Sequence, residues 1–147
     1  KWRKEIGYIS QNIFLLDGSI KKNISFNFAD EKIYEEKLKK AIQIAELSEK
    51  ILSLKKGLDT QVGTDGLTFS GGERQRIAIA RAIYKKPEIF FMDEFTSALD
   101  SHTEDNIINN FYKHLPNSTM IMIAHRKETI KKCDEVWKIE NGRLIKL

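Results

Sequence analysis

One apolar run with two acids at its end shapes the whole interpretation of this chain, and it reads Glu88-Ile89-Phe90-Phe91-Met92-Asp93-Glu94. Strands that are buried on both faces of a parallel sheet are near-continuous apolar runs, so this segment predicts such a strand. Asp93 and Glu94 then lie at its carboxyl end, where open α/β sheets bind ligands. One acid there can hold Mg²⁺ while the other polarises an attacking water, as phosphoryl transfer requires. Without further context, the two acids can equally well cap the following turn.

The residues after this strand predict a return to the same sheet. Ser101 and Thr103 can cap a helix that runs to about Leu115. Residues 119–124 then predict a second buried strand, which ends at His125. A strand, a helix and a strand in this order indicate a right-handed parallel crossover.

Strands are also predicted at both ends of the chain. Residues 5–9 predict a short strand, and the polar turn that follows it contains Gln11. Residues 135–139 and 143–147 flank Asn141-Gly142, a dipeptide typical of tight hairpins. The chain is therefore expected to close on an antiparallel hairpin. Three aromatic residues are expected in the core, namely Phe90, Phe91 and Trp137.

The middle of the chain is predicted to be helical. Apolar residues recur at helical intervals over residues 30–54, which predicts one long or two short amphipathic helices with Asp30 as a cap. Ser70 and Gly71-Gly72 open another periodic segment that ends near Pro87. Backbone amides at such a helix start can approach a phosphate closely, although the glycines can also be only a flexible helix start.

The composition describes a globular chain of about one domain. Its 147 residues are 41% hydrophobic and 31% charged, with a formal net charge of +4. The basic residues are scattered, so this excess does not by itself imply nucleic acid. Cys133 is the single cysteine, which favours a reducing compartment. The chain opens at Lys1 without a cap or turn signal, so we expect it to begin within something larger.

Four motifs in order resemble the nucleotide-binding domain of ABC ATPases: Ser70-Gly71-Gly72-Glu73-Arg74-Gln75-Arg76, Phe91-Met92-Asp93-Glu94, Thr96-Ser97-Ala98-Leu99-Asp100 and Ile123-Ala124-His125-Arg126. The resemblance implies an α/β fold, with a P-loop NTPase core that contributes a partial parallel sheet. It also implies an inserted helical subdomain and a carboxyl-terminal hairpin. The corresponding regions are residues 1–29 around the Q-loop, 30–86 with the signature motif, and 87–147 from Walker B to the hairpin.

The resemblance assigns a role to each motif residue, with ATP and Mg²⁺ as cofactors. By this resemblance, Asp93 is the magnesium-side acid, Glu94 is the general base and His125 is the switch histidine. Gln11 corresponds to the Q-loop glutamine, whose carbonyl reaches Mg²⁺. The signature motif and the D-loop add further nucleotide contacts, from Ser70, Gly71, Gly72, Glu73 and Asp100. The other two histidines, His102 and His114, match no motif and are expected on a helix surface.

Two less specific stretches, residues 17–24 and 60–66, resemble patterns of exporter-type ABC proteins. The resemblance then implies a transmembrane partner domain, a second nucleotide-binding domain in a head-to-tail dimer, and a place at the cytoplasmic face of the membrane. No nucleic acid partner is expected on this interpretation. Two alternatives stay open at this point. One is an ABC-type ATPase that acts on DNA or in translation, and the other is a non-catalytic binding fragment.

The chain departs from the family pattern at two places. Glu73 stands where the signature usually carries Gln, and a carboxylate near a triphosphate adds repulsion. No Gly-x-x-x-x-Gly-Lys-Ser/Thr loop is found in these 147 residues. The chain therefore resembles the carboxyl-terminal part of such a domain, and we expect it to hydrolyse ATP negligibly by itself.

Overall fold

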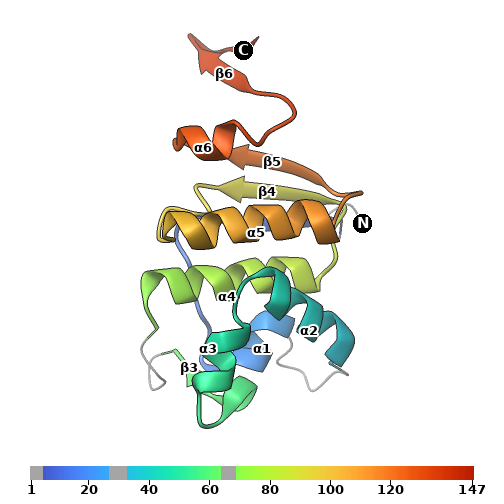
Figure 1. Cartoon of the computed structure of the whole chain (residues 1–147), viewed down its shortest axis with the longest axis vertical. Coiled ribbons are helices and arrows are strands. Elements are labelled where there is room, and N and C mark those ends of the chain that lie inside the picture. The colour runs from blue at the N-terminus through green and yellow to red at the C-terminus, as the bar shows by residue number, and fades with distance from the viewer. Residues whose placement is uncertain (1–4, 27–32, 64–68) are drawn as a thin grey trace.

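A parallel sheet of three strands forms the centre of the molecule (Figure 1). The computed structural model describes residues 5–26, 33–63 and 69–147. The strands follow the order β1–β4–β5, with bounds Ile6–Ile9, Ile89–Asp93 and Thr119–Ile123. Both neighbouring pairs are parallel, and helix α5 (Ser101–His114) connects β4 to β5. The predicted strands and their parallel crossover are thus confirmed.

Helices α4 (Gly71–Tyr84) and α5 lie on the same side of this sheet in Figure 1. Phe90 of β4 is fully buried, and its ring meets the ring of Phe111 of α5 edge-on, with centroids 5.2 Å apart. Phe95, just after β4, makes a second edge-on contact with Phe111. This aromatic cluster fastens α5 to the strand that carries Asp93.

The opposite face of the sheet is open within the described residues. Tyr8, Phe91 and Ile121 are direct neighbours across the three strands, and each is at least 38% exposed. The predictions of a buried strand at residues 119–124 and of a core position for Phe91 are therefore wrong. The apolar run indicated cover on both faces, whereas the structure shows cover on one face only.

The helical middle consists of short elements packed beside α4 (Figure 1). The expectation of two short helices over residues 30–54 is met by α2 (Glu35–Ile44) and α3 (Ser48–Ser53). The proposed cap Asp30 lies outside the described residues. The sequence analysis missed several short elements, among them α1 (Ile20–Ser25) and the two-strand pair β2 (Gly18–Ser19) and β3 (Gln61–Val62). The 3₁₀ helix η2 (Gly57–Asp59), which the sequence analysis also missed, follows α3.

The cap of α5 differs from the prediction. Asp100, and neither Ser101 nor Thr103, is the N-cap residue. Its carboxylate accepts hydrogen bonds from the Thr103 backbone amide at 2.9 Å and from the Thr103 hydroxyl at 2.7 Å. Asp is a strong N-cap because its oxygen satisfies a free amide of the first turn. Of the two histidines on this helix, His102 is exposed and His114 is half-buried.

The predicted hairpin is confirmed as β6 (Trp137–Glu140) and β7 (Arg143–Lys146), which follow the short helix α6 (Lys127–Ile130). Asn141 and Gly142 both have positive φ, as a tight two-residue turn requires. Every residue of both strands is exposed, and the hairpin projects from the rest of the molecule in Figure 1. The core position expected for Trp137 is therefore wrong, because Trp137 is 51% exposed on a strand that pairs with β7.

Candidate functional site

The carboxyl ends of the three central strands bring three of the sequence-predicted residues together. Register aligns Ile9 with Met92 and Asp93 with Ile123, so the residues just after each strand meet at one edge of the sheet. The Gln11 amide Nε2 donates to Glu94 Oε2 at 2.5 Å. His125 Nε2 lies 2.8 Å from Glu94 Oε1. Glu94 is thus the centre of the cluster, and both its oxygens have a partner.

The backbone of Glu94 is held in an unusual conformation. Its φ is 44°, in the left-handed region that non-glycine residues seldom adopt. The Glu94 amide donates to the carbonyl of Ile123 at 3.1 Å, and the Glu94 carbonyl accepts from the Ser97 amide at 3.0 Å. Such strain persists only where the surroundings hold it, and it clusters at active sites. The strained turn leaves the Glu94 side chain 28% exposed at the sheet edge.

Asp93, the last residue of β4, is half-buried directly beside this cluster. No group of three or more acidic, histidine or cysteine side chains that could hold a metal exists within the described part of the chain. Mg²⁺ in nucleotide sites usually takes only one or two carboxylates, with substrate phosphates and waters as the other ligands. One acid at this edge is therefore compatible with a magnesium that arrives with a nucleotide.

The signature residues form the start of α4. Ser70 is its N-cap, and its Oγ accepts from the Glu73 amide at 3.2 Å. Glu73 Oε2 accepts in return from the Ser70 amide at 2.9 Å, which completes a capping box. A Cβ at Gly72 would lie 2.9 Å from the carbonyl oxygen of Ala98, so only glycine fits there without a shift. The signature helix and the residues before Asp100 are thus in direct contact.

Gln75 joins these two parts of the site, and the sequence analysis missed it. Its side chain is 1% exposed. Its Oε1 accepts from the Ala98 amide at 3.0 Å, and its Nε2 lies 3.5 Å from the Glu94 carbonyl. One glutamine therefore fixes the turn that follows Glu94. The sequence contained a signal that Gln75 is buried, because its helical spacing places it on the same face as the apolar Ile79 and Ile83.

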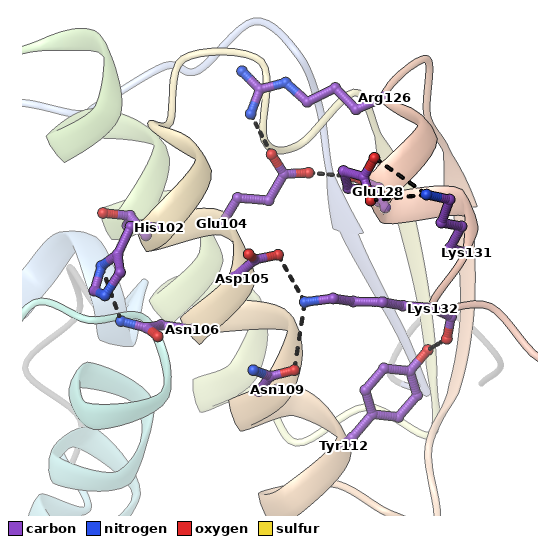
Figure 2. Close-up of polar contacts among 12 residues, drawn as sticks. His102, Glu104, Asp105, Asn106, Asn109, Tyr112, Arg126, Glu128, Lys131 and Lys132 are labelled. Carbon is purple, nitrogen blue, oxygen red and sulfur yellow. Dashed lines mark hydrogen bonds and ion pairs between the residues drawn. The ribbon is translucent and has the colours of Figure 1, made fainter.

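A second missed contact supports the loop of His125 (Figure 2). The neighbouring Arg126 forms an ion pair with Glu104 of α5 and also donates to the Leu99 carbonyl at 3.1 Å. Glu104 is 4% exposed and accepts a further hydrogen bond from the Thr129 hydroxyl. This network connects the histidine loop to the segment before Asp100. An acid in helical register with the buried Ile107, Ile108 and Phe111 was the signal that sequence reasoning overlooked.

Cap geometry explains the acidity of Asp100. Hydrogen bonds from the backbone amide and the hydroxyl of Thr103 hold the pKa of the Asp100 carboxyl below its ordinary value of 3.8. Asp100 is exposed beside the signature helix and stays ionised at neutral pH. Cys133 is half-buried, and burial raises the pKa of its thiol. Partial burial and a raised thiol pKa favour a small packing residue over a reactive thiol.

Comparisons with known proteins agree on one family. A family model described as "ABC transporter" matches residues 1–97. The chain is 41% identical over 143 residues to ABC transporter B family member 18 of Arabidopsis thaliana, covering 97% of this chain and 12% of that protein. It is also 41% identical over 143 residues to the ATP-dependent lipid A-core flippase of Shewanella denitrificans, again over 97% of this chain, and 24% of the flippase.

A solved structure extends this agreement to three dimensions. A bacterial Atm1-family ABC exporter with ATP bound superposes with a TM-score of 0.86 at 36% identity, covering 97% of this chain and 24% of that one. The chain thus spans no more than about a quarter of the length of these relatives. Within the described residues, no helix is both long and apolar enough to cross a membrane. The matched model, the sequence relatives and the fold together place this chain in the ABC transporter family.

Proposed function

We propose that this chain is the carboxyl-terminal part of an ATP-hydrolysing domain that powers export across a membrane. The observation that carries the proposal is the convergence of Gln11 and His125 on the carboxylate of Glu94, at 2.5 and 2.8 Å. Relatives named as an ABC exporter and a flippase support the direction of transport. The regions proposed within the domain are residues 1–29, 30–86 and 87–147.

The residues of the site fit magnesium-bound ATP. Asp93 and Gln11 supply oxygen donors of the kind Mg²⁺ prefers, and both lie at the edge where parallel sheets bind ligands. Ser70, Gly71 and Gly72 present a helix start of small residues, where backbone amides can face phosphate oxygens. Bound ATP would supply the phosphoanhydride bond to be cleaved, and Mg²⁺ would neutralise charge on its phosphates.

Glu94 is the proposed general base. A carboxylate offers about four lone-pair positions, so Glu94 can accept from a water while Gln11 and His125 keep their contacts. Accepting the water proton at Glu94 neutralises its charge, and the neighbouring His125 Nε2–H can then turn to stabilise charge on a phosphate oxygen. Gln75 and Arg126 hold the loops that aim these groups.

The signature residues are proposed to act on a second nucleotide. Ser70 to Glu73 and Asp100 of this chain would meet the ATP held by a second nucleotide-binding domain, in a head-to-tail dimer. The other proposed partner is a transmembrane domain, which places this chain at the cytoplasmic face of the membrane. Both partners are implied by the family and by the small share of its relatives that the chain spans.

The test is hydrolysis of Mg-ATP by the complete protein that contains this chain. Glu94→Gln is expected to slow turnover by about 10²- to 10⁴-fold, because general-base catalysis contributes about that much. It should leave ATP binding largely intact, since Gln is isosteric. The isolated 147-residue chain is expected to show negligible turnover. Wild-type turnover in the Glu94→Gln protein, or brisk turnover by the isolated chain, would contradict the proposal.

A further inference from the structure

The unusual signature residue Glu73 has a dedicated cationic partner. Lys50 of α3 places its Nζ 2.8 Å from Glu73 Oε1. The same Nζ lies 5.6 Å from the centroid of the Phe69 ring, the residue just before the signature cap. Glu73 and Lys50 are only 17% and 28% exposed, so solvent screens this pair incompletely. A short helix of the inserted subdomain therefore reaches the first turn of α4.

Each oxygen of the Glu73 carboxylate has a partner within this chain. One oxygen accepts from the Ser70 amide, and the other meets Lys50. Burial alone would raise the pKa of the Glu73 carboxyl, but the hydrogen bonds from Lys50 and the Ser70 amide bring it below its ordinary value. The side chain is consequently ionised at neutral pH, and its charge is balanced locally.

This arrangement leaves the rest of the signature free. The Ser70 Oγ acts as an acceptor in the cap, so its hydroxyl hydrogen stays available for a ligand. Ser70 and Gly71 are exposed. The Glu73 charge would repel a phosphate bound beside it, and Lys50 Nζ lies 2.8 Å from that carboxylate. A Gln at this position would make the same capping box without that charge.

We propose that Lys50 is a positioning residue of the signature motif, which neutralises Glu73 so that Ser70 and the glycine amides can bind the γ-phosphate of ATP. This inference rests on the proposed function of the signature. It assigns to the inserted helical subdomain a residue that sets nucleotide affinity, although it lies outside the motif.

The experiment measures the Kd for Mg-ATP in the complete protein, in a Glu94→Gln background so that no nucleotide is consumed. Lys50→Met is expected to weaken binding about three- to tenfold at low salt, as one uncompensated charge in a partly exposed site would. The loss should shrink near 1 M salt, where the screening length falls to about 3 Å. Lys50→Arg keeps the charge and should bind like the parent protein. Lys56→Met removes an exposed lysine of the following loop and serves as the matched control.

The decisive comparison is the double variant Lys50→Met/Glu73→Gln, which keeps the cap and removes both charges. Recovery of the parent Kd supports neutralisation, because a lost packing contact would not be restored by changing Glu73. An unchanged Kd in Lys50→Met, or a double variant as weak as Lys50→Met, overturns the proposal. Lys50→Gln replaces Lys50→Met if the latter does not fold. The proposed function has its own readout, which is ATP turnover by the protein with Glu94 intact and by its Glu94→Gln variant, and not the Kd for Mg-ATP.

Discussion

The ion pair between Arg126 and Glu104 offers a quantitative test of how the histidine loop is held (Figure 2). Arg126→Met removes the guanidinium and leaves Glu104, whose side chain is 5% exposed, with the Thr129 hydroxyl as the remaining donor to its carboxylate among the described residues. Breaking a fully buried pair costs about 3–5 kcal/mol, whereas an exposed pair contributes about 0–1 kcal/mol. Arg126 is 42% exposed, so water replaces part of its contribution. We therefore expect a loss of about 2–3 kcal/mol in the free energy of unfolding.

The assay is urea unfolding followed by circular dichroism, on the nucleotide-binding domain that includes this chain. Glu104→Gln/Arg126→Met should recover about 1 kcal/mol or more relative to Arg126→Met, because no buried charge is then stranded. Lys131→Met is the matched control, because the ion pair of Lys131 with Glu128 is exposed. Its loss should change the free energy of unfolding by less than about 0.5 kcal/mol. A cost for Arg126→Met no larger than that of Lys131→Met would show that the ion pair with Glu104 does not stabilise the domain. A double variant as unstable as Arg126→Met would show that the stranded Glu104 charge does not cause the loss.

Two further predictions concern the signature and the D-loop. Gly72→Ala is expected to lower the unfolding midpoint and ATP turnover, because its Cβ would lie 2.9 Å from the Ala98 carbonyl oxygen. Gly71→Ala, whose Cβ would make an ordinary 3.4 Å contact, should be mild, and equal effects of the two would contradict the packing. Asp100→Asn tests the α5 cap by pH. The carboxyl pKa is lowered on folding, so its stabilisation is present above the ordinary value of 3.8 and is lost as pH falls below it. The urea midpoint of Asp100→Asn should therefore change less with pH in that acidic range than the midpoint of the wild-type protein. Equal pH dependence of the two midpoints would show that the Asp100 carboxylate does not stabilise the start of α5.

Local sequence patterns predicted most of the helices and strands along the chain. The apolar run at residues 89–92, the signature helix and the Asn141-Gly142 hairpin were all predicted correctly, because each depends on neighbours in sequence. Short elements such as α1 and the β2–β3 pair were missed. Two-residue strands carry no periodicity, and their pairing is decided by distant residues.

Burial was less predictable than element type. Phe91 and Trp137 have core-like side chains, yet they are 38% and 51% exposed. An aromatic residue indicates a preference for burial, but the available cover depends on which elements pack above it. The described residues cover one face of the sheet and leave the hairpin apart, and neither fact is encoded locally.

The family, the order of the motifs and the strand-end positions of Gln11, Asp93, Glu94 and His125 were all predictable before folding was considered. They follow from residue type, spacing and the parallel alternation of strands and helices. Which groups touch one another depends instead on how the chain packs. Parallel register brings Gln11 and His125 onto one carboxylate, Gln75 and Arg126 fasten the adjoining loops, and Lys50 reaches Glu73 from another helix. Each of these contacts joins residues far apart in the chain. The distances between their side chains depend on how helices and strands pack, and a local sequence pattern carries no information about that packing.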